Sequence, residues 1–229
     1  MDRHAIENTQ KGNLADIKGK RNLLVSFGGI HQGLGMPVFE FFKSLNKVDC
    51  DKVFLRDFER AWYQKGVGAE MDHIDKVRAY LKDLIAENQY HRICFLGSSM
   101  GAYAAILFGA MLEANKVIAF APQTFIDRIN RLKYYDRRWS EEISRLHSFS
   151  AKRKEYFDLK KYLGQLGDFK TEIALYYASS DRLDKKHAER LGQMAQVKLY
   201  PQVKGGHEVV KHIRDTGELD EIIRNAFAN

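Results

Sequence analysis

Short apolar runs alternate along the chain with longer stretches in which apolar positions recur every three or four residues. The runs have the length and composition of buried β-strands, and the repeating stretches have the period of α-helices. Strands that alternate with helices form a parallel sheet covered on both faces. We therefore expect an α/β fold with a mostly parallel sheet of about six strands. The expected strands lie at residues 22–27, 52–56, 92–96, 116–121, 172–178 and 197–200, and the expected helices at 38–45, 70–88, 102–108, 184–196 and from 207 onward.

Length and composition favour one domain. The chain has 229 residues, of which 45% are hydrophobic, and this is enough to bury one sizeable core. It contains three prolines and neither a Ser/Gly-rich run nor an internal repeat, which argues against a long linker or a repeat architecture. We expect residues 1–229 to form a single domain, with a polar tail at 1–20 before the first strand.

Residues 97–101, Gly-Ser-Ser-Met-Gly, lie between an apolar strand and an Ala-rich helix. This is the G-x-S-x-G pattern in the strand–turn–helix setting of a nucleophile elbow. Ser99 would occupy a strained turn, so the residues two before and two after it must lack clashing side chains. The following helix would point free N–H groups at the reaction centre. We predict that Ser99 is a nucleophile; the alternative is a tight glycine turn that packs helix on strand.

A serine nucleophile needs an acid and a base, which in this setting follow it in that order. Asp181 follows the expected strand 172–178, and His207 lies in the loop after the last strand. We predict a Ser99–His207–Asp181 triad and prefer Asp181 to Asp184 because it is closer to the strand end. The alternative role of either aspartate is to cap the next helix. Six histidines in polar or helical contexts are expected at the surface: His4, His73, His91, His147, His187 and His212.

A glycine-dense loop at residues 28–35 follows the first expected strand. Without side chains, its backbone N–H groups can approach a substrate oxygen. We predict an oxyanion hole made by the N–H groups of Met100 and Gly29, with Ile30 as the alternative loop donor. Ile30 and His31 are also candidates to contact substrate, although His31 could instead hydrogen-bond the loop. The loop lacks the spacing of a phosphate-binding loop.

The ordered set of Gly28-Gly29, residues 97–101, Asp181 and His207 resembles the α/β-hydrolase superfamily, from about Asn22 to the end of the chain. The chain departs from the superfamily in two ways. A polar tail stands where leading strands are common, and the first loop reads Phe-Gly-Gly where many members have His-Gly. The resemblance implies a small, divergent serine esterase or thioesterase that uses no cofactor.

By the same resemblance, residues 124–168 form a helical cap over the active site. This segment is the most basic part of a chain whose net charge is +7. A cap rich in Lys, Arg, Tyr and Trp suits an anionic or glycan-like substrate, and a solvated helix face explains it equally well. Four further residues at strand ends are candidate substrate contacts, or alternatively core residues: Arg56, Trp62, Tyr63 and Gln123.

The sequence gives little indication of binding to nucleic acid, of a membrane span, of secretion or of a metal site. The basic residues are spread among acids without a nucleic-acid motif, and no apolar stretch approaches a membrane span. The first residues are too polar for a signal peptide. Cys50 and Cys94 suggest neither a disulfide framework nor a metal site. We expect a cytoplasmic protein without metal or cofactor, and its oligomeric state stays open.

These features predict cleavage of an ester or thioester through an acyl-enzyme. The first loop and the Trp-Tyr segment also resemble small hydrolase-like proteins of bacterial surface-polysaccharide pathways, which implies an O-acylated glycan as substrate. Three alternatives remain: an acyltransferase with the same triad, a non-catalytic binding protein, and a basic nucleic-acid or membrane-surface binder. The intact Ser, Asp and His argue against the second, and only the net charge supports the third.

Overall fold

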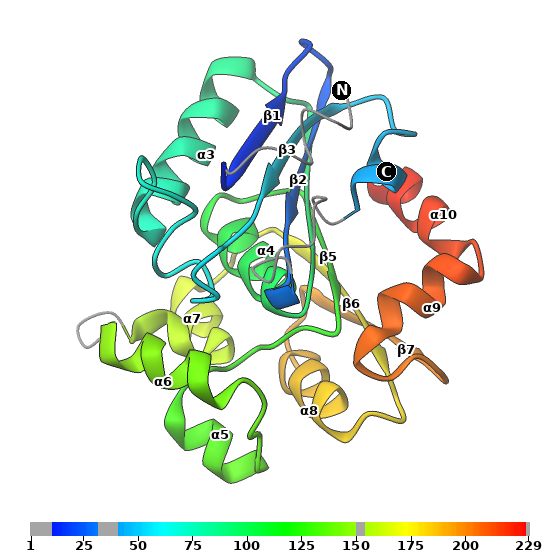
Figure 1. Cartoon of the computed structure of the whole chain (residues 1–229). Coiled ribbons are helices and arrows are strands. Elements are labelled where there is room, and N and C mark those ends of the chain that lie inside the picture. Colours follow the sequence, from blue (N-terminus) through cyan, green and yellow to red (C-terminus); the bar gives the residue numbers. More distant parts are fainter. Residues whose placement is uncertain (1–10, 32–40, 150–153, 228–229) are drawn as a thin grey trace.

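A seven-stranded sheet forms the centre of the computed structural model, which describes residues 11–31, 41–149 and 154–227 (Figure 1). The strand order is β1-β3-β2-β4-β5-β6-β7, and all pairs are parallel except β1 with β3. This confirms the expected α/β fold. The strands are β1 (Asn13–Asp16), β2 (Asn22–Phe27), β3 (Asp51–Leu55), β4 (Arg92–Ser98), β5 (Lys116–Phe120), β6 (Glu172–Ala178) and β7 (Val197–Gln202).

Strand β1 lies within the stretch that was expected to be a polar tail, and this expectation was wrong. Leu14 pairs with Phe54, and Asp16 pairs with Lys52, along the edge of β3. Because β1 is a short edge strand with one large apolar residue, its own sequence carries no strand pattern, and the pairing with β3 defines it. The sheet therefore has seven strands rather than about six.

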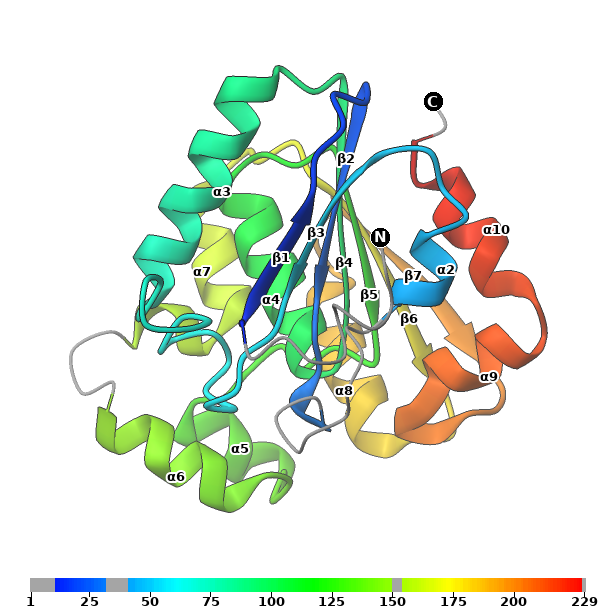
Figure 2. The same ribbon diagram turned by 45° about the horizontal axis from the view of Figure 1, so that its top comes forward.

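Helices cover both faces of the sheet (Figure 2). One face carries α3 (Ile74–Asn88), α4 (Met100–Met111), α7 (Leu159–Leu166) and α8 (Arg182–Leu191), and the other carries α2 (Phe42–Leu45), α9 (Val209–Asp215) and α10 (Glu218–Arg224). The helix expected from residue 207 onward is broken between α9 and α10, where Gly217 has a φ of 85°. The part of the expected 38–45 helix before residue 41 lies outside the described residues. No helix within the described ranges has both the length and the apolar character needed to cross a membrane.

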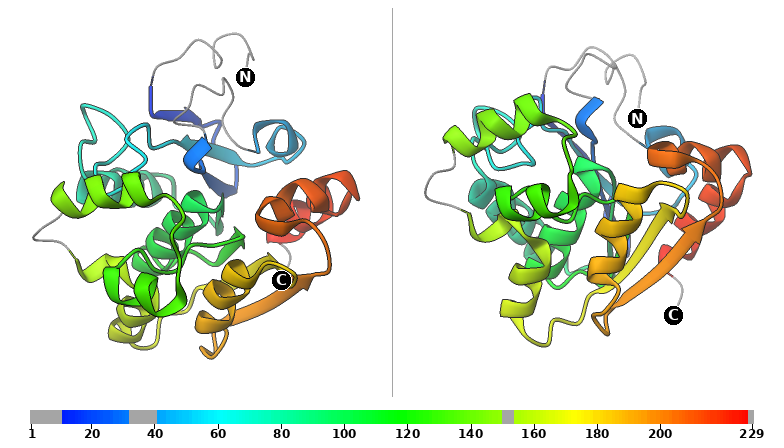
Figure 3. Two further views of the ribbon diagram at one scale, coloured as in Figure 1. Left: turned by 60° about the horizontal axis from the view of Figure 1, so that its bottom comes forward. Right: turned by 90° about the horizontal axis from the view of Figure 1, so that it is seen from below.

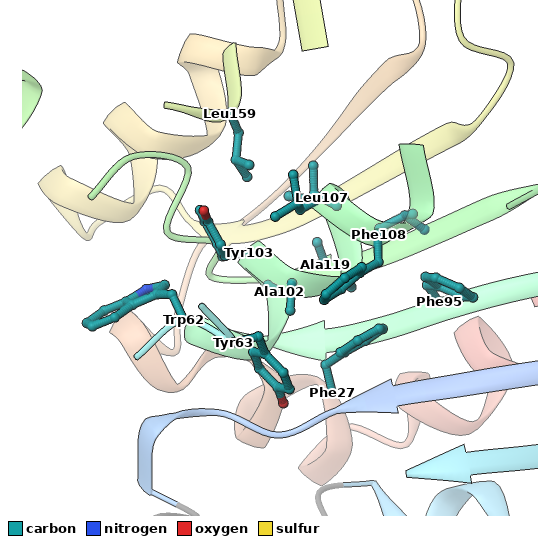
Figure 4. Packing of buried hydrophobic residues seen from close by; sticks show 14 of the residues in the cluster. Phe27, Trp62, Tyr63, Phe95, Ala102, Tyr103, Leu107, Phe108, Ala119 and Leu159 are labelled. Carbon is teal, nitrogen blue, oxygen red and sulfur yellow. The ribbon is translucent and has the colours of Figure 1, made fainter. Parts of the chain in front are cut away.

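An aromatic cluster fixes α4 against the sheet (Figure 4). The ring of Phe27 on β2 stacks on Phe108 of α4 at 5.6 Å, and it also meets the rings of Phe95 and Tyr63 at 5.5 Å. All four side chains are fully buried. Burying one such ring contributes about 2–3 kcal/mol, so this cluster is a main reason why α4 keeps its position over β2 and β4.

The segment expected to form a cap, residues 124–168, divides into two parts. Helices α5 (Arg128–Tyr134) and α6 (Ser140–Phe149) lie beyond the carboxyl ends of the strands (Figure 3). The 3₁₀ helix η2 (Glu155–Phe157) then leads into α7, whose Leu159 and Leu163 are fully buried in the main core. Only the first part of the segment therefore projects over the end of the sheet.

Replacement of Gly101 by Ala should prevent stable folding. A Cβ at Gly101 would lie 2.1 Å from the carbonyl oxygen of Phe27, and neither backbone can move without disturbing the core. We expect a loss of more than ~3 kcal/mol in the free energy of unfolding, measured by urea denaturation. The matched control is Gly164→Ala in α7, where a Cβ meets nothing within 4 Å and should stabilise the helix by about 0.5–1 kcal/mol. Equal effects in the two variants would contradict this account.

Candidate active site

Ser99 lies in the turn between β4 and α4, as the sequence predicted. Its φ of 52° and ψ of −115° are strained for a residue with a side chain, and its N–H donates to the carbonyl of Phe120 at 2.9 Å. The flanking glycines make the turn possible, since a Cβ at Gly97 would lie 2.2 Å from the carbonyl oxygen of Gly101. The turn places the serine hydroxyl at the carboxyl end of the sheet and at the N-terminus of α4.

His207 is brought to Ser99 across 108 residues of sequence. It lies in the 3₁₀ helix η3 (Gly206–Glu208), after Gly205, whose φ of 113° favours glycine. The Oγ atom of Ser99 is 2.9 Å from Nε2 of His207. A hydrogen bond of this length is what a serine and its general base require.

The carboxylate beside His207 belongs to Asp184 and not to Asp181. Both carboxylate oxygens of Asp184 lie 2.9 Å from Nδ1 of His207. The carboxylate of Asp181 instead accepts the N–H groups of Leu183 and Asp184 at 2.9 Å and caps α8. As the N-cap, Asp181 directs its carboxylate to N–H groups of its own helix, whereas Asp184, in the first turn of α8, contacts the histidine.

This arrangement fixes the tautomer of His207. An ionised carboxylate only accepts hydrogen bonds, so Nδ1–H of His207 donates to Asp184, and Nε2 is left to accept the Ser99 hydroxyl. Burial alone would raise the pKa of Asp184, but its hydrogen bonds with His207 and Arg138 and the positive charge of Arg138 hold it below its ordinary value. The side chain of Asp184 is fully buried and ionised beside the imidazole.

The loop after β2 lies beside the first turn of α4. The N–H of Gly28 donates to Leu55 at 2.8 Å, and the hydroxyl oxygen of Tyr63 lies 3.0 Å from the Gly28 carbonyl oxygen, so the start of the loop is held from two sides. Ile30 is buried and His31 is exposed, with its ring 5.4 Å from that of Trp139. The rest of the glycine-dense loop, residues 32–35, lies outside the described residues.

Comparison with solved structures gives the fold a name. The chain is 15% identical to the α/β hydrolase enzyme MGS-MChE2 from a lagoon-sediment metagenome, with a TM-score of 0.58 over 94% of this chain and 95% of that one. It is 16% identical to the capsule O-acetyltransferase of Neisseria meningitidis serogroup A, with a TM-score of 0.64 over 93% of this chain and 90% of that one. The chain has the α/β-hydrolase fold.

A third similar structure is the glycosylation-associated protein complex Gap123 of Streptococcus agalactiae. Identity is 20% and the TM-score is 0.67, over 95% of this chain and 47% of that one, so the chain spans about half the length of that protein. No protein-family model matches the sequence, and no curated protein matches it.

Four residues that the sequence suggested as substrate contacts are core residues in the structure. Arg56, Trp62, Tyr63 and Gln123 each expose 4% of their surface or less. The indole N–H of Trp62 donates to Gln123 at 2.7 Å, and the carboxylate of Asp57 accepts the N–H of Tyr63 at 2.8 Å. Left-handed backbone at Trp62 and Tyr63, with φ of 50° and 60°, turns the two rings inward. The structure supports the packing alternative for all four.

Sequence reasoning missed a buried polar network next to Asp184 and His207. Arg138, in the segment between α5 and α6, donates to Asp184 at 2.7 Å and to Asp136 at 3.0 Å. His187 was expected at the surface but is fully buried, and its Nε2 lies 3.0 Å from Asp136. His147, also expected at the surface, is buried and lies 2.9 Å from the Ile126 carbonyl. The spacing of His187 three residues after Asp184 was the available signal, because it places both on one face of a helix.

Among the described residues, no cluster of three or more His, Cys, Asp or Glu side chains is arranged to hold a metal ion. Around Ser99, the structure brings together the serine hydroxyl, the imidazole of His207 and the N-terminus of α4. Met100 is the first residue of α4, and the N–H groups of a first helical turn have no acceptor within their own helix.

Proposed function

We propose that this protein is a serine hydrolase that cleaves an ester or thioester through an acyl-enzyme intermediate. The observation that carries the proposal is the hydrogen-bonded chain from Ser99 Oγ through His207 to Asp184, built at the strained turn after β4. A nucleophile, a base and an orienting acid in hydrogen-bond contact are the parts that acyl transfer needs.

Each residue takes a step in the proposed reaction. Nε2 of His207 accepts the Ser99 proton as Oγ attacks the substrate carbonyl, and Asp184 stabilises the imidazolium that forms. The N–H groups of Met100 and Gly29 receive the negative charge on the carbonyl oxygen. His207 then returns the proton to the leaving group, and a water molecule attacks the acyl-enzyme by the same route.

The surroundings of Ser99 favour a polar or anionic substrate. Arg138 exposes 20% of its side chain beside the triad, and the segment that carries it is the most basic part of the chain. Ile30 and His31 are the remaining loop candidates for substrate contact. Cys50 and Cys94 are both buried and free, which is typical of a reducing compartment such as the cytoplasm.

A fluorophosphonate probe should label wild-type protein at Ser99 and leave Ser99→Ala unlabelled, because the probe reacts only with an activated serine. Turnover of a p-nitrophenyl ester should fall at least about 10⁴-fold in Ser99→Ala and in His207→Ala, with unchanged thermal unfolding. Ser98→Ala, which removes the neighbouring hydroxyl, is the matched control. A wild-type protein that neither labels nor hydrolyses any ester in a panel of acyl lengths would contradict the proposal and favour a non-catalytic binding protein.

Replacing Asp181 and Asp184 one at a time by asparagine should show which of them orients His207 and which only caps helix α8. Asp184→Asn should lose about 10³–10⁴-fold in kcat, because the amide cannot hold the imidazole in its productive tautomer. Asp181→Asn should keep its activity, because asparagine caps a helix as well as aspartate does. The measurement is the steady-state rate on one ester for both variants. If Asp181→Asn lost its activity and Asp184→Asn kept it, Asp181 would be the acid of the triad and this assignment would be wrong.

A second candidate is acyl transfer to a hydroxyl group of a glycan by the same triad. It is favoured by the similarity to a capsule O-acetyltransferase and to a glycosylation-associated protein complex. In a transferase, the acyl-enzyme reacts with the acceptor faster than with water.

The fraction of acyl group transferred to a sugar, compared with the fraction released as free acid, should therefore distinguish a transferase from a hydrolase. We expect added monosaccharides or oligosaccharides to leave the yield of free acid from a p-nitrophenyl ester unchanged if the protein is a hydrolase. Mass spectrometry of the same mixture would detect an acylated sugar. An acylated sugar formed at the expense of free acid, in wild type but not in Ser99→Ala, would establish the transferase instead.

A further inference from the structure

Arg138 joins two buried carboxylates, one of which belongs to the proposed triad. Its Nη1 donates to Oδ1 of Asp184 at 2.7 Å, and its Nε and Nη2 donate to the two oxygens of Asp136 at 3.1 and 3.0 Å. The side chains of Asp184 and Asp136 are 0% and 3% exposed. A two-pronged pairing of guanidinium with carboxylate sets direction as well as distance, so Asp136 fixes the plane in which Arg138 reaches Asp184.

His187 connects Asp136 to the buried interior of the protein. Nδ1 of His187 accepts the N–H of Thr124 at 2.9 Å, so Nε2 carries the proton and donates to Asp136 at 3.0 Å. Burial lowers the pKa of His187, which keeps its ring neutral. The ring of Phe125 stacks on His187 at 3.9 Å. Asp136 is therefore anchored to α8 and to the end of β5, and it cannot follow Arg138 if the latter moves.

Arg138 is the cation that the two buried carboxylates share. It contacts both Asp136 and Asp184, and a second cation, Arg131, lies 3.9 Å from Asp136 only. Burial alone would raise the pKa of Asp136, but His187 and Arg138 hold it far below its ordinary value. Two buried carboxylates without a cation are strongly unfavourable.

Arg138 also contacts the imidazole of His207. Its Nη1 lies 3.4 Å from Nδ1 of His207, and because both nitrogens carry protons this is a contact between donors rather than a hydrogen bond. The other groups that face the imidazole are the carboxylate of Asp184 and the hydroxyl of Ser99. The neighbouring Glu208 is 75% exposed and lies 4.0 Å from Lys211, so it faces solvent.

We propose that Arg138 is a positioning residue, which aligns the Asp184 carboxylate with His207 and is itself held by Asp136 and His187. The segment between α5 and α6 thereby completes the active site from outside the sheet. This inference rests on the proposed function. It assigns to the basic segment a role in arranging the triad, in addition to any contact with substrate.

Three variants test the proposal through separate measurement of kcat and KM. Arg138→Gln should lower kcat about 10- to 100-fold with little change in KM, because the acid loses its alignment. Arg138→Lys keeps the positive charge without the planar fork of N–H groups, so it should have an intermediate kcat. Arg214→Gln, at an exposed arginine of α9 outside this segment, is the matched control and should behave as wild type.

The double variant Asp136→Asn with Arg138→Gln controls for misfolding of the single variant. It removes one negative and one positive charge together, so no additional unpaired charge is left buried. It should unfold at a temperature close to that of wild type while keeping the low kcat of Arg138→Gln. Recovery of the wild-type rate in the double variant would overturn the proposal, because Arg138 would then serve only to neutralise Asp136. A rise in KM with kcat unchanged in Arg138→Gln would overturn it as well, because Arg138 would then contact substrate and not align the acid.

Labelling and turnover of the wild-type protein separate failure of this inference from failure of the proposed function. A wild type that neither labels nor turns over an ester would end the hydrolase proposal, and this inference with it. An active wild type beside an equally active Arg138→Gln would overturn this inference alone.

Discussion

The close approach of the first turn of α4 to strand β2 is the constraint on which the site depends. A single Cβ at Gly101 would overlap the Phe27 carbonyl, and one at Gly97 would overlap the carbonyl of Gly101. Only because both positions lack side chains can Ser99 take up its left-handed backbone at the tip of β4. The aromatic cluster around Phe27 supplies the burial that offsets this strain.

The carboxyl end of the sheet collects groups from segments that are far apart in the chain. The serine comes from the turn after β4, the histidine from the turn after β7, and the carboxylate from the first turns of α8. This placement follows from parallel strands, whose carboxyl ends all face one edge. The segment between α5 and α6 then adds a cation, Arg138, that touches the carboxylate from outside the sheet.

Charge pairing organises the interior of this end of the molecule. Asp184 and Asp136 are buried, and each is satisfied by a histidine on one side and by Arg138 on the other. Such a network is stabilising only when every member is paired, since a lone buried charge costs several kcal/mol. The same requirement explains why His187, which stands among charged residues in the sequence, is fully buried in the fold.

The sequence by itself determined the alternation of strands and helices, the turn around Ser99 and the position of His207, because these depend on local periodicity and on glycine stereochemistry. Strand β1 was not visible, since an edge strand of four residues is defined by its partner. Only the tertiary structure placed Asp184, and not Asp181, beside His207. It also buried Trp62 against Gln123 and brought Arg138 to Asp184. The residues that meet in these contacts are 23 to 69 positions apart in the sequence. Contacts of this kind depend on how helices and loops pack, which a local sequence pattern does not predict.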